Sequence, residues 1–138
     1  MNVRQLMSKD PVTVQPESTL QEAAEKMHKK NIGAVLVIEN GMLKGILTDR
    51  DIALTAAAQG LDPKNTPVSQ CMVPDPISID ANADIDSALR IMNRASVRRL
   101  PVLENGKVIG VISSSDLAEA IKDQFEQFVG LEEAYARD

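Results

Sequence analysis

The stretch ENGMLKGILTDRD, residues 39–51, occurs a second time as ENGKVIGVISSSD, residues 104–116. In both copies an Asn-Gly pair separates two apolar runs, which is typical of a tight β-hairpin turn. Each copy continues with a hydroxyl residue and, three positions later, an aspartate, which is typical of the first turn of a helix. The sequence therefore predicts a hairpin followed by a helix, used twice.

The repeat extends well beyond these two stretches. Residues 3–52 align with residues 68–117 without a gap, and thirteen of the fifty aligned pairs are identical. The identical pairs include turn residues as well as apolar ones, which indicates a true internal repeat. A short alternating strand is predicted after the Asp-Pro pair of each copy, at residues 12–14 and 77–79.

A helix is predicted next in each copy, because apolar residues recur at positions i, i+3, i+4 and i+7. Its candidate N-cap residues are Ser18 or Thr19 in the first copy and Asp84 in the second. The hairpin strands are expected at residues 34–38, 43–48, 100–103 and 108–113. With a second helix beginning near Asp49 and Ser114, each unit is a strand, a helix, two strands and a helix.

The predicted domain organisation is a first unit at residues 1–59, a linker at 60–67, a second unit at 68–122 and a C-terminal helical extension at 123–138. Gly60 and the turn residues after it indicate a capped helix end and a short link. One such unit alone would expose a face of its sheet, so the two units are expected to pack sheet against sheet about a pseudo-twofold axis. The predicted fold class is α+β, with two β-α-β-β-α units and two related clefts.

Composition argues against several classes of protein. The formal net charge of −5 argues against broad nucleic-acid binding, and no apolar stretch approaches the roughly twenty residues of a membrane span. The single cysteine, Cys71, cannot form an intramolecular disulfide, and no secretory leader precedes Val3. We therefore expect a cytoplasmic protein that contacts neither nucleic acid nor membrane.

The order of elements and the pattern Gly-h-h-Ser/Thr-x-x-Asp at residues 45–51 and 110–116, where h is apolar, resemble the CBS domain family, named after cystathionine β-synthase. The resemblance covers nearly all of residues 3–120. It implies a tandem pair of the kind that occurs alone in bacteria and archaea, and whole modules that form a homodimer. It also implies clefts between the units that bind an adenine nucleotide (AMP, ADP or ATP), with S-adenosylmethionine ranked behind them. No cofactor is otherwise required.

Two pairs of side chains in the repeated pattern are the main candidates for contacts with this ligand. Thr48 with Asp51, and Ser113 with Asp116, fall on one side of the first turn of a helix. The carboxylate can accept hydrogen bonds from both ribose hydroxyls, while the hydroxyl and the free N–H groups of the helix start can face phosphate. The alternative is that Thr48 and Ser113 are ordinary N-caps and that the aspartates only favour the helix dipole.

Candidate ligand residues also begin the first hairpin strand of each unit. They are Ile32, Gly33 and Ala34 in the first copy and Val97, Arg98 and Arg99 in the second. In similar CBS modules a basic residue here reaches the nucleotide phosphates, so Arg98 and Arg99 are the phosphate candidates. The first copy has no charge at these positions, so one strong site and one weak or empty site are expected. The alternative for the arginines is a solvated rim.

Four further residues complete the predicted nucleotide sites. Gly45 and Gly110 are expected to allow a close backbone approach. Thr13 and Ser78 lie on the strand after the Asp-Pro pair. By analogy with the family, they would line the base end of each cleft.

Metal and catalytic sites lack candidates in the sequence. His28 is the only histidine and fits the surface of its helix, so zinc would have too few of its usual ligands. The serines at 113–115 have no base to pair with, so we predict neither a metal site nor an enzyme. Cys71 takes the place of Leu6 in the other copy and is expected to be a small buried hydrophobe.

All the aromatic residues lie in the C-terminal extension, outside the repeat: Phe125, Phe128 and Tyr135. Leu117, Ile121, Phe125 and Phe128 keep helical spacing, and Gly130 is a candidate helix stop. We expect this extension to pack on the module itself or on a partner subunit.

The predicted function is regulatory: the protein senses an adenine nucleotide and acts through a partner protein that its sequence does not identify. The alternative is a protein-interaction or structural module whose nucleotide clefts are vestigial. An enzyme is the least favoured class, because no catalytic motif is present.

Overall fold

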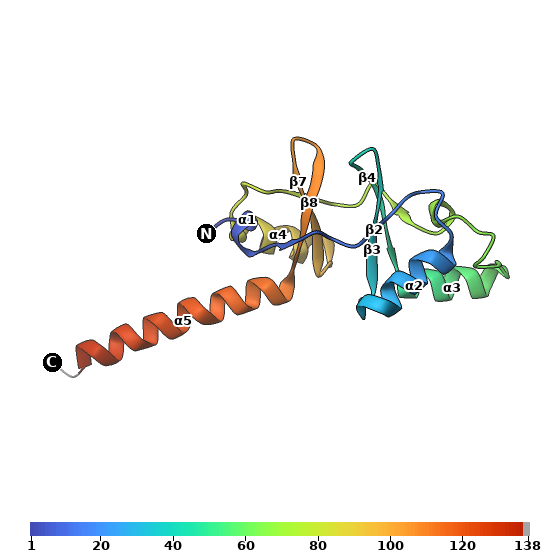
Figure 1. Ribbon diagram of the computed structural model, residues 1–138. Helices are drawn as coiled ribbons and strands as arrows, with labels where there is room; N and C mark the ends of the chain where they lie inside the picture. The colour runs from blue at the N-terminus through green and yellow to red at the C-terminus, as the bar shows by residue number, and fades with distance from the viewer. Residues whose placement is uncertain (137–138) are drawn as a thin grey trace.

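The computed structural model describes residues 1–136 and contains the strand-helix-strand-strand-helix order twice (Figure 1). The elements of the first unit are α1 (Val3–Leu6), β1 (Ser8–Lys9), β2 (Thr13–Val14), α2 (Leu20–Lys30), β3 (Ala34–Glu39), β4 (Met42–Thr48) and α3 (Asp49–Gln59). Those of the second unit are the 3-10 helix η1 (Val68–Gln70), β5 (Val73–Pro74), β6 (Ile79–Asp80), α4 (Ile85–Ala95), β7 (Arg99–Glu104), β8 (Lys107–Ser113) and α5 (Ser114–Ala136). The predicted fold class is confirmed.

The two hairpins lie side by side in the middle of the molecule, and the helices cover the outside (Figure 1). Helices α2 and α3 pack beside the first hairpin, whereas α4 and the first turns of α5 pack beside the second. A bridge between Met42 and Lys107 joins the hairpin tips, so the strands follow the order β2-β3-β4-β8-β7-β6. Lys107 is the counterpart of Met42 in the repeat, so this bridge marks the pseudo-twofold axis.

Asn-Gly turns close both hairpins, as predicted. The angle φ is 53° at Asn40 and Asn105 and 79° at Gly41 and Gly106. Two successive positive φ values are what a type I′ hairpin turn needs. The register of both hairpins also shifts at the same place, so the two units agree down to single residues.

The predicted helix starts are confirmed for α2 and α4. Thr19 caps α2 and accepts a hydrogen bond from the Glu22 N–H at 3.1 Å, whereas Ser18 closes the turn before the helix. Asp84 caps α4 and accepts a hydrogen bond from the Ser87 N–H at 2.8 Å. This bond lowers the pKa of the Asp84 carboxyl, because it stabilises the charged form.

The strand after each Asp-Pro pair is shorter than predicted. The strand predicted at 12–14 corresponds to β2, which begins at Thr13. The strand predicted at 77–79 corresponds to β6, which begins only at Ile79. Ile79 is buried and pairs with β7, whereas Ile77 is 51% exposed. The alternation of apolar residues therefore begins before the residues that pair with the sheet.

The segment before each of these strands packs against the other unit, an exchange that the sequence does not predict. Val3 lies in the core of the second unit, and its N–H donates to the Ala83 carbonyl at 2.9 Å. Val68 lies in the core of the first unit, and its N–H donates to the Ser18 carbonyl at 2.7 Å. Likewise β1 pairs with β8, and β5 pairs with β4. The core of each unit thus contains the first segment of the other sequence repeat.

Each unit has its own apolar core, with Leu47 fully buried in the first and its counterpart Ile112 in the second. Cys71 belongs to the first core, as predicted. Burial raises the pKa of the Cys71 thiol, and the nearby Asp51 carboxylate raises it further. The thiol is therefore a neutral packing group.

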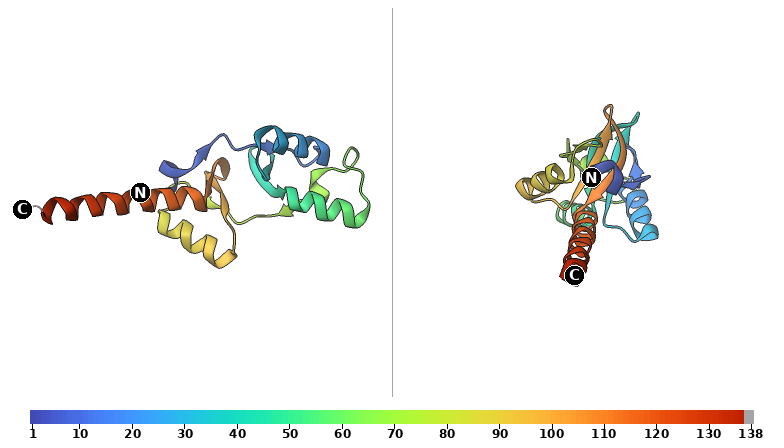
Figure 2. Two further views of the ribbon diagram at one scale, coloured as in Figure 1. Left: turned by 90° about the horizontal axis from the view of Figure 1, so that it is seen from below. Right: turned by 90° about the vertical axis from the view of Figure 1, so that its left-hand side faces the viewer.

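Helix α5 continues without a break and projects alone from the body (Figure 2). Ala120 is the last buried residue of the described chain, whereas Phe125, Phe128 and Tyr135 are 65%, 58% and 70% exposed. The prediction that the extension packs on its own module is therefore wrong for this part of the chain. The predicted stop at Gly130 is also wrong, because a glycine in a helix costs only about 1 kcal/mol. Positions 137 and 138 of the predicted extension lie outside the described residues.

Candidate functional site

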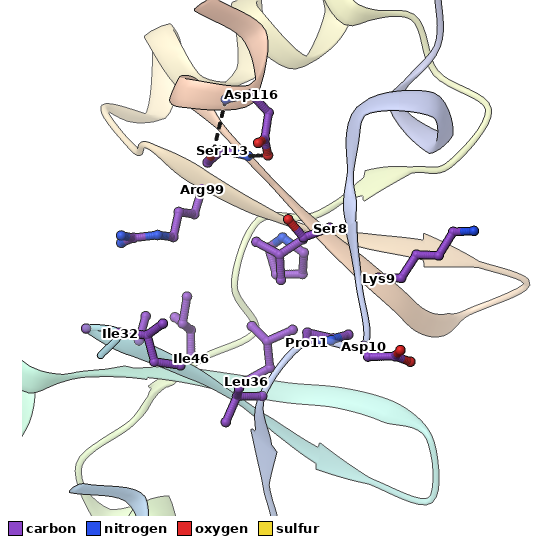
Figure 3. Close-up of a pocket in the computed structure, with 15 residues that line it drawn as sticks. Ser8, Lys9, Asp10, Pro11, Ile32, Leu36, Ile46, Arg99, Ser113 and Asp116 are labelled. Atoms are coloured by element: carbon purple, nitrogen blue, oxygen red, sulfur yellow. Dashed lines mark hydrogen bonds between the residues drawn. The ribbon is translucent and has the colours of Figure 1, made fainter. Parts of the chain in front are cut away.

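A cleft of about 310 Å³ lies between the two units (Figure 3). The second unit supplies Arg99, Ser113 and Asp116 to it, and the first supplies residues 8–12 and 32–34. The remaining lining residues are apolar: Leu36, Ile46, Pro101 and Val111. In the repeat, Leu36 corresponds to Pro101 and Ile46 to Val111, so the apolar floor of the cleft lies across the pseudo-twofold axis.

Ser113 and Asp116 hold each other through two hydrogen bonds at the start of α5 (Figure 3). The Asp116 N–H donates to Ser113 Oγ at 3.1 Å, and the Ser113 N–H donates to Asp116 Oδ2 at 2.9 Å. Asp116 Oδ1 has no such partner within residues 1–136, and the Ser113 hydroxyl still has a proton to donate. Both side chains are half-buried, so they are held in position and remain accessible from the cleft.

The first unit repeats this geometry at the start of α3. The Asp51 N–H donates to Thr48 Oγ1 and the Thr48 N–H donates to Asp51 Oδ2, both at 3.0 Å. Thr48 is thus the N-cap of α3, and the capping alternative holds for this pair. In both pairs, Thr48 with Asp51 and Ser113 with Asp116, capping leaves the second carboxylate oxygen and the hydroxyl proton free to bind a ligand.

The two arginine candidates lie in different surroundings. Arg99 lines the cleft, and its side chain extends along the same side as Ile32 (Figure 3). Arg98 does not line this cleft. Both arginines are exposed, and neither forms an ion pair with another side chain of residues 1–136. Of the two arginines, Arg99 therefore shares the cleft with Asp116 and Arg98 does not.

The predicted strand residues of the first unit form the wall opposite Asp116. Ile32, Gly33 and Ala34 all line the cleft, whereas Val97, the counterpart of Ile32, lies outside it. The cleft thus combines the acidic residue of one repeat with the strand start of the other.

Thr13 and Ser78, predicted for the base end, do not line this cleft. Thr13 pairs within the sheet, and its carbonyl accepts a hydrogen bond from Lys26 Nζ at 2.7 Å. Ser78 is half-buried just before β6. The prediction is therefore not met for Thr13 in the Asp116 cleft, whereas Ser78 belongs by the repeat to the Asp51 side.

Sequence reasoning missed residues 8–12, which cross from β1 along the cleft. A signal for them was available, because the pair Asp10-Pro11 returns as Asp75-Pro76. The angle φ is 55° at Asp10 and 47° at Asp75, in the left-handed region that non-glycine residues seldom adopt. Both aspartates turn the chain out of the exchanged strand and back into its own unit.

The close backbone approach predicted at Gly45 and Gly110 is made by the chain itself. A Cβ atom on Gly45 would lie 2.9 Å from the Val73 carbonyl oxygen, and one on Gly110 would lie 2.7 Å from the Ser8 carbonyl oxygen. Both glycines are buried beneath an exchanged strand, and neither lines the cleft. Packing thus accounts for them without a ligand.

The described residues, 1–136, contain neither a metal-binding cluster nor a membrane span among their helices. Within these residues no group of three or more histidine, cysteine, aspartate or glutamate side chains could hold a metal ion. His28 is exposed on α2. None of the helices in this part of the chain is both long and apolar enough to cross a membrane.

The sequence and the fold both match known proteins. The family model of the CBS domain matches twice, at residues 3–57 and 68–123. The chain is 42% identical over 117 residues to the CBS domain-containing protein YhcV of Bacillus subtilis, covering 85% of this chain and 83% of that protein.

Two solved structures resemble the fold closely. The crystal structure of Hypoxic Response Protein I with two coordinated zinc ions has a TM-score of 0.80 and 32% identity, covering 86% of this chain and 98% of that one. The CBS domain pair of protein MJ0100, in complex with 5′-methylthioadenosine and S-adenosyl-L-methionine, has a TM-score of 0.78 and 25% identity, covering 90% and 98%.

Proposed function

This chain belongs to the CBS domain family, and we propose that it is a regulatory module that binds an adenine nucleotide: AMP, ADP or ATP. The observation that carries the proposal is the cleft between the units, where Asp116, Ser113 and Arg99 border an apolar floor. A ribose needs an acceptor for its hydroxyls, a phosphate needs a cation and a purine needs apolar walls. The cleft contains all three.

Asp116 is the proposed ribose contact. Its Oδ2 is held by the Ser113 N–H, so Oδ1 is the oxygen that accepts hydrogen bonds from the ribose hydroxyls. Arg99 is the proposed phosphate contact, because it has no ion pair within residues 1–136 and lines the cleft. A hydrogen bond to a charged group contributes about 1.5–3 kcal/mol, enough to make both contacts matter.

The adenine ring is proposed to lie on the apolar floor. The cleft volume of about 310 Å³ is at the small end of ligand pockets, so a base and a ribose fill it and phosphate reaches its edge. The complex of MJ0100 supports an adenosine compound as the ligand class. S-adenosylmethionine ranks behind the nucleotides, because its sulfonium cation would take the place of the phosphate near Arg99.

Regulation follows from the position of the ligand. Because the cleft walls come from both units, a bound nucleotide contacts both halves and favours one relative arrangement of them. We propose that a partner protein reads this arrangement, since the chain has no catalytic motif of its own.

One strong site, centred on Asp116, is the proposed stoichiometry. Arg99 lines the Asp116 cleft, and so does Ala34, whose counterpart in the repeat is Arg99 itself. Gly33 also lines this cleft, so its counterpart Arg98 falls on the Asp51 side by the repeat. The preference for Asp116 therefore rests on Lys29 and Lys30, which line a hollow beside this cleft and have Arg94 and Ala95 as counterparts in the second unit.

A second copy of this chain is the proposed cover for the exposed face of α5. Its three aromatic side chains are 58–70% exposed, which amounts to roughly 400 Å² per copy. A stable interface buries about 800 Å² per partner, so the pairing of α5 with α5 needs added contacts from the body. We expect the intact chain to be a dimer by light scattering and a chain ending at Lys122 to be largely monomeric. An intact monomer, or a truncated chain that stays dimeric, would contradict this.

Isothermal titration of the nucleotide-stripped protein with AMP, ADP, ATP and S-adenosylmethionine tests the proposed function. We expect saturable binding of at least one nucleotide, close to one equivalent per chain, and weaker binding of S-adenosylmethionine. Silence from all four would favour the other reading, an interaction module with vestigial clefts. The exposed apolar face of α5 is the observation that favours that reading.

A further inference from the structure

A second hollow, of about 580 Å³, adjoins the nucleotide cleft on the side of α2. It is lined by Lys26, Lys29 and Lys30, and we name it the lysine hollow. The two spaces share part of their lining, including Pro11 and Ile32. A ligand that extends from the cleft past Ile32 therefore reaches the lysine hollow.

The cleft and the lysine hollow together gather positive charge. Five basic side chains line them, the three lysines with Lys9 and Arg99, against the two carboxylates of Asp10 and Asp116. The chain as a whole carries a net charge of −5. A local excess of positive charge on an acidic protein favours an anionic ligand at that place.

None of the three lysines forms an ion pair within residues 1–136. Lys26 Nζ donates to the Thr13 carbonyl at 2.7 Å, which holds its ammonium group at the edge of the hollow. Lys29 and Lys30 are exposed and form no ion pair within residues 1–136. Both lie in the last turn of α2, where the helix dipole favours a cation, but Lys26 lies one turn earlier. The dipole alone therefore does not account for the set.

The second unit shows that the fold itself does not require these lysines. At the equivalent positions of α4 the chain has Ile91, Arg94 and Ala95, so a single basic residue remains. Both helices end in the same left-handed cap, at Asn31 and Ser96. The difference in charge is thus independent of how the helices end.

We propose that the lysine hollow takes the outer phosphates of the nucleotide, so that this cleft prefers a nucleoside triphosphate or diphosphate to a monophosphate. The inference rests on the proposed function, because it assumes that the nucleotide lies in the Asp116 cleft. Arg99 extends on the same side as Ile32 and meets the first phosphate (Figure 3). The later phosphates pass Ile32 and meet Lys29 and Lys30. Each added phosphate brings further negative charge to a region that is already positive.

Titration of a Lys29→Gln, Lys30→Gln double variant with AMP and ATP tests the proposal, and Arg94→Gln on α4 is the matched control. The intact protein should bind ATP more tightly than AMP. In the double variant ATP should weaken about tenfold and AMP by less than about twofold, because only ATP reaches the lysines. The control should leave both affinities unchanged. Inorganic tripolyphosphate should compete with ATP on the intact protein and compete less on the double variant.

Three outcomes would overturn the proposal, and they can be told apart. Equal binding of AMP and ATP by the intact protein would reject the lysine hollow while leaving the proposed function standing. An equal loss of AMP and ATP in the double variant would also reject it, provided that its melting temperature is unchanged. Silence of the intact protein toward every nucleotide would reject both the inference and the proposed function.

Discussion

The two units agree in their turns and helix starts but carry positive charge in different places. The same φ values occur in both Asn-Gly turns, and the same two hydrogen bonds begin α3 and α5. By contrast, the first unit has three lysines toward the end of α2, whereas the second has Arg98 and Arg99 at the entrance to β7. The shared features shape the backbone, and of the differing ones Arg99 borders the cleft and the lysines border the lysine hollow. We therefore attribute the difference to ligand binding and not to folding.

This difference means that the pseudo-twofold axis relates two backbones but not two equal sites. Asp116 faces Arg99 and the uncharged strand start of the first unit. On the Asp51 side the counterparts of Gly33 and Ala34 are Arg98 and Arg99, and the counterpart of Arg99 is Ala34. Substitutions at paired positions should therefore have equal effects where the units agree and unequal effects where they differ.

The largest effect should be equal in the two units. Gly45→Ala and Gly110→Ala should each lower the free energy of unfolding by about 2–3 kcal/mol, because the new Cβ meets the backbone of an exchanged strand. Urea unfolding measures this, with Gly130→Ala in exposed α5 as the control that should not destabilise. If alanine is tolerated at Gly45 or Gly110, the exchange of strands is wrongly described.

The next effect should be unequal. Asp116→Asn should weaken nucleotide binding by about tenfold or more, since it removes the charge from the proposed ribose contact. Asp51→Asn should change it by less than about threefold. Asparagine can still accept the capping hydrogen bond, so both helices should keep their starts. Titration calorimetry on the two variants decides the matter, and equal losses would show two equivalent sites.

A smaller contrast is expected between the neighbouring arginines. Arg99→Gln should weaken AMP binding by about fivefold, because this side chain lines the Asp116 cleft. Arg98→Gln should leave the affinity within about twofold, because Arg98 lies outside that cleft. The reverse order would move the strong site to the Asp51 side.

The smallest effect concerns the helix caps, where the first unit uses neutral Thr19 and the second uses Asp84. The pKa of Asp84 is lowered from its ordinary value of 3.8 by the Ser87 N–H. Its contribution to stability is therefore present above the unfolded pKa and is lost as the pH falls through the folded pKa. The difference in melting temperature between the intact protein and Asp84→Ala should shrink as the pH drops below about 4. A difference that is constant with pH would show that the charge of Asp84 plays no part.

Local signals in the sequence predicted local structure. Asn40-Gly41 and its repeat fixed the hairpin turns, and Thr19 and Asp84 fixed the helix starts, because each depends on a few neighbouring residues. Local signals could not predict that the first segment of each repeat packs in the core of the other unit. Val3 and Val68 are identical and equally apolar, and nothing near them says which core they enter.

The candidate site was predicted in part for the same reason. Ser113, Asp116 and Arg99 belong to one repeat and were found through its pattern, and the structure brings them together. Residues 8–12 and the lysines of α2 border the site only because chain segments from both repeats meet there. Such a meeting depends on the tertiary fold, which no single repeat encodes.

The central claim is that one adenine nucleotide binds in the cleft between Asp116 and residues 32–34. The most direct measurement is a titration of the ¹⁵N-labelled protein with AMP, followed by amide chemical shifts. The largest changes should occur at residues 113–116, at Arg99 and at residues 32–34. Largest changes around Thr48 and Asp51, or no changes at saturating AMP, would contradict it.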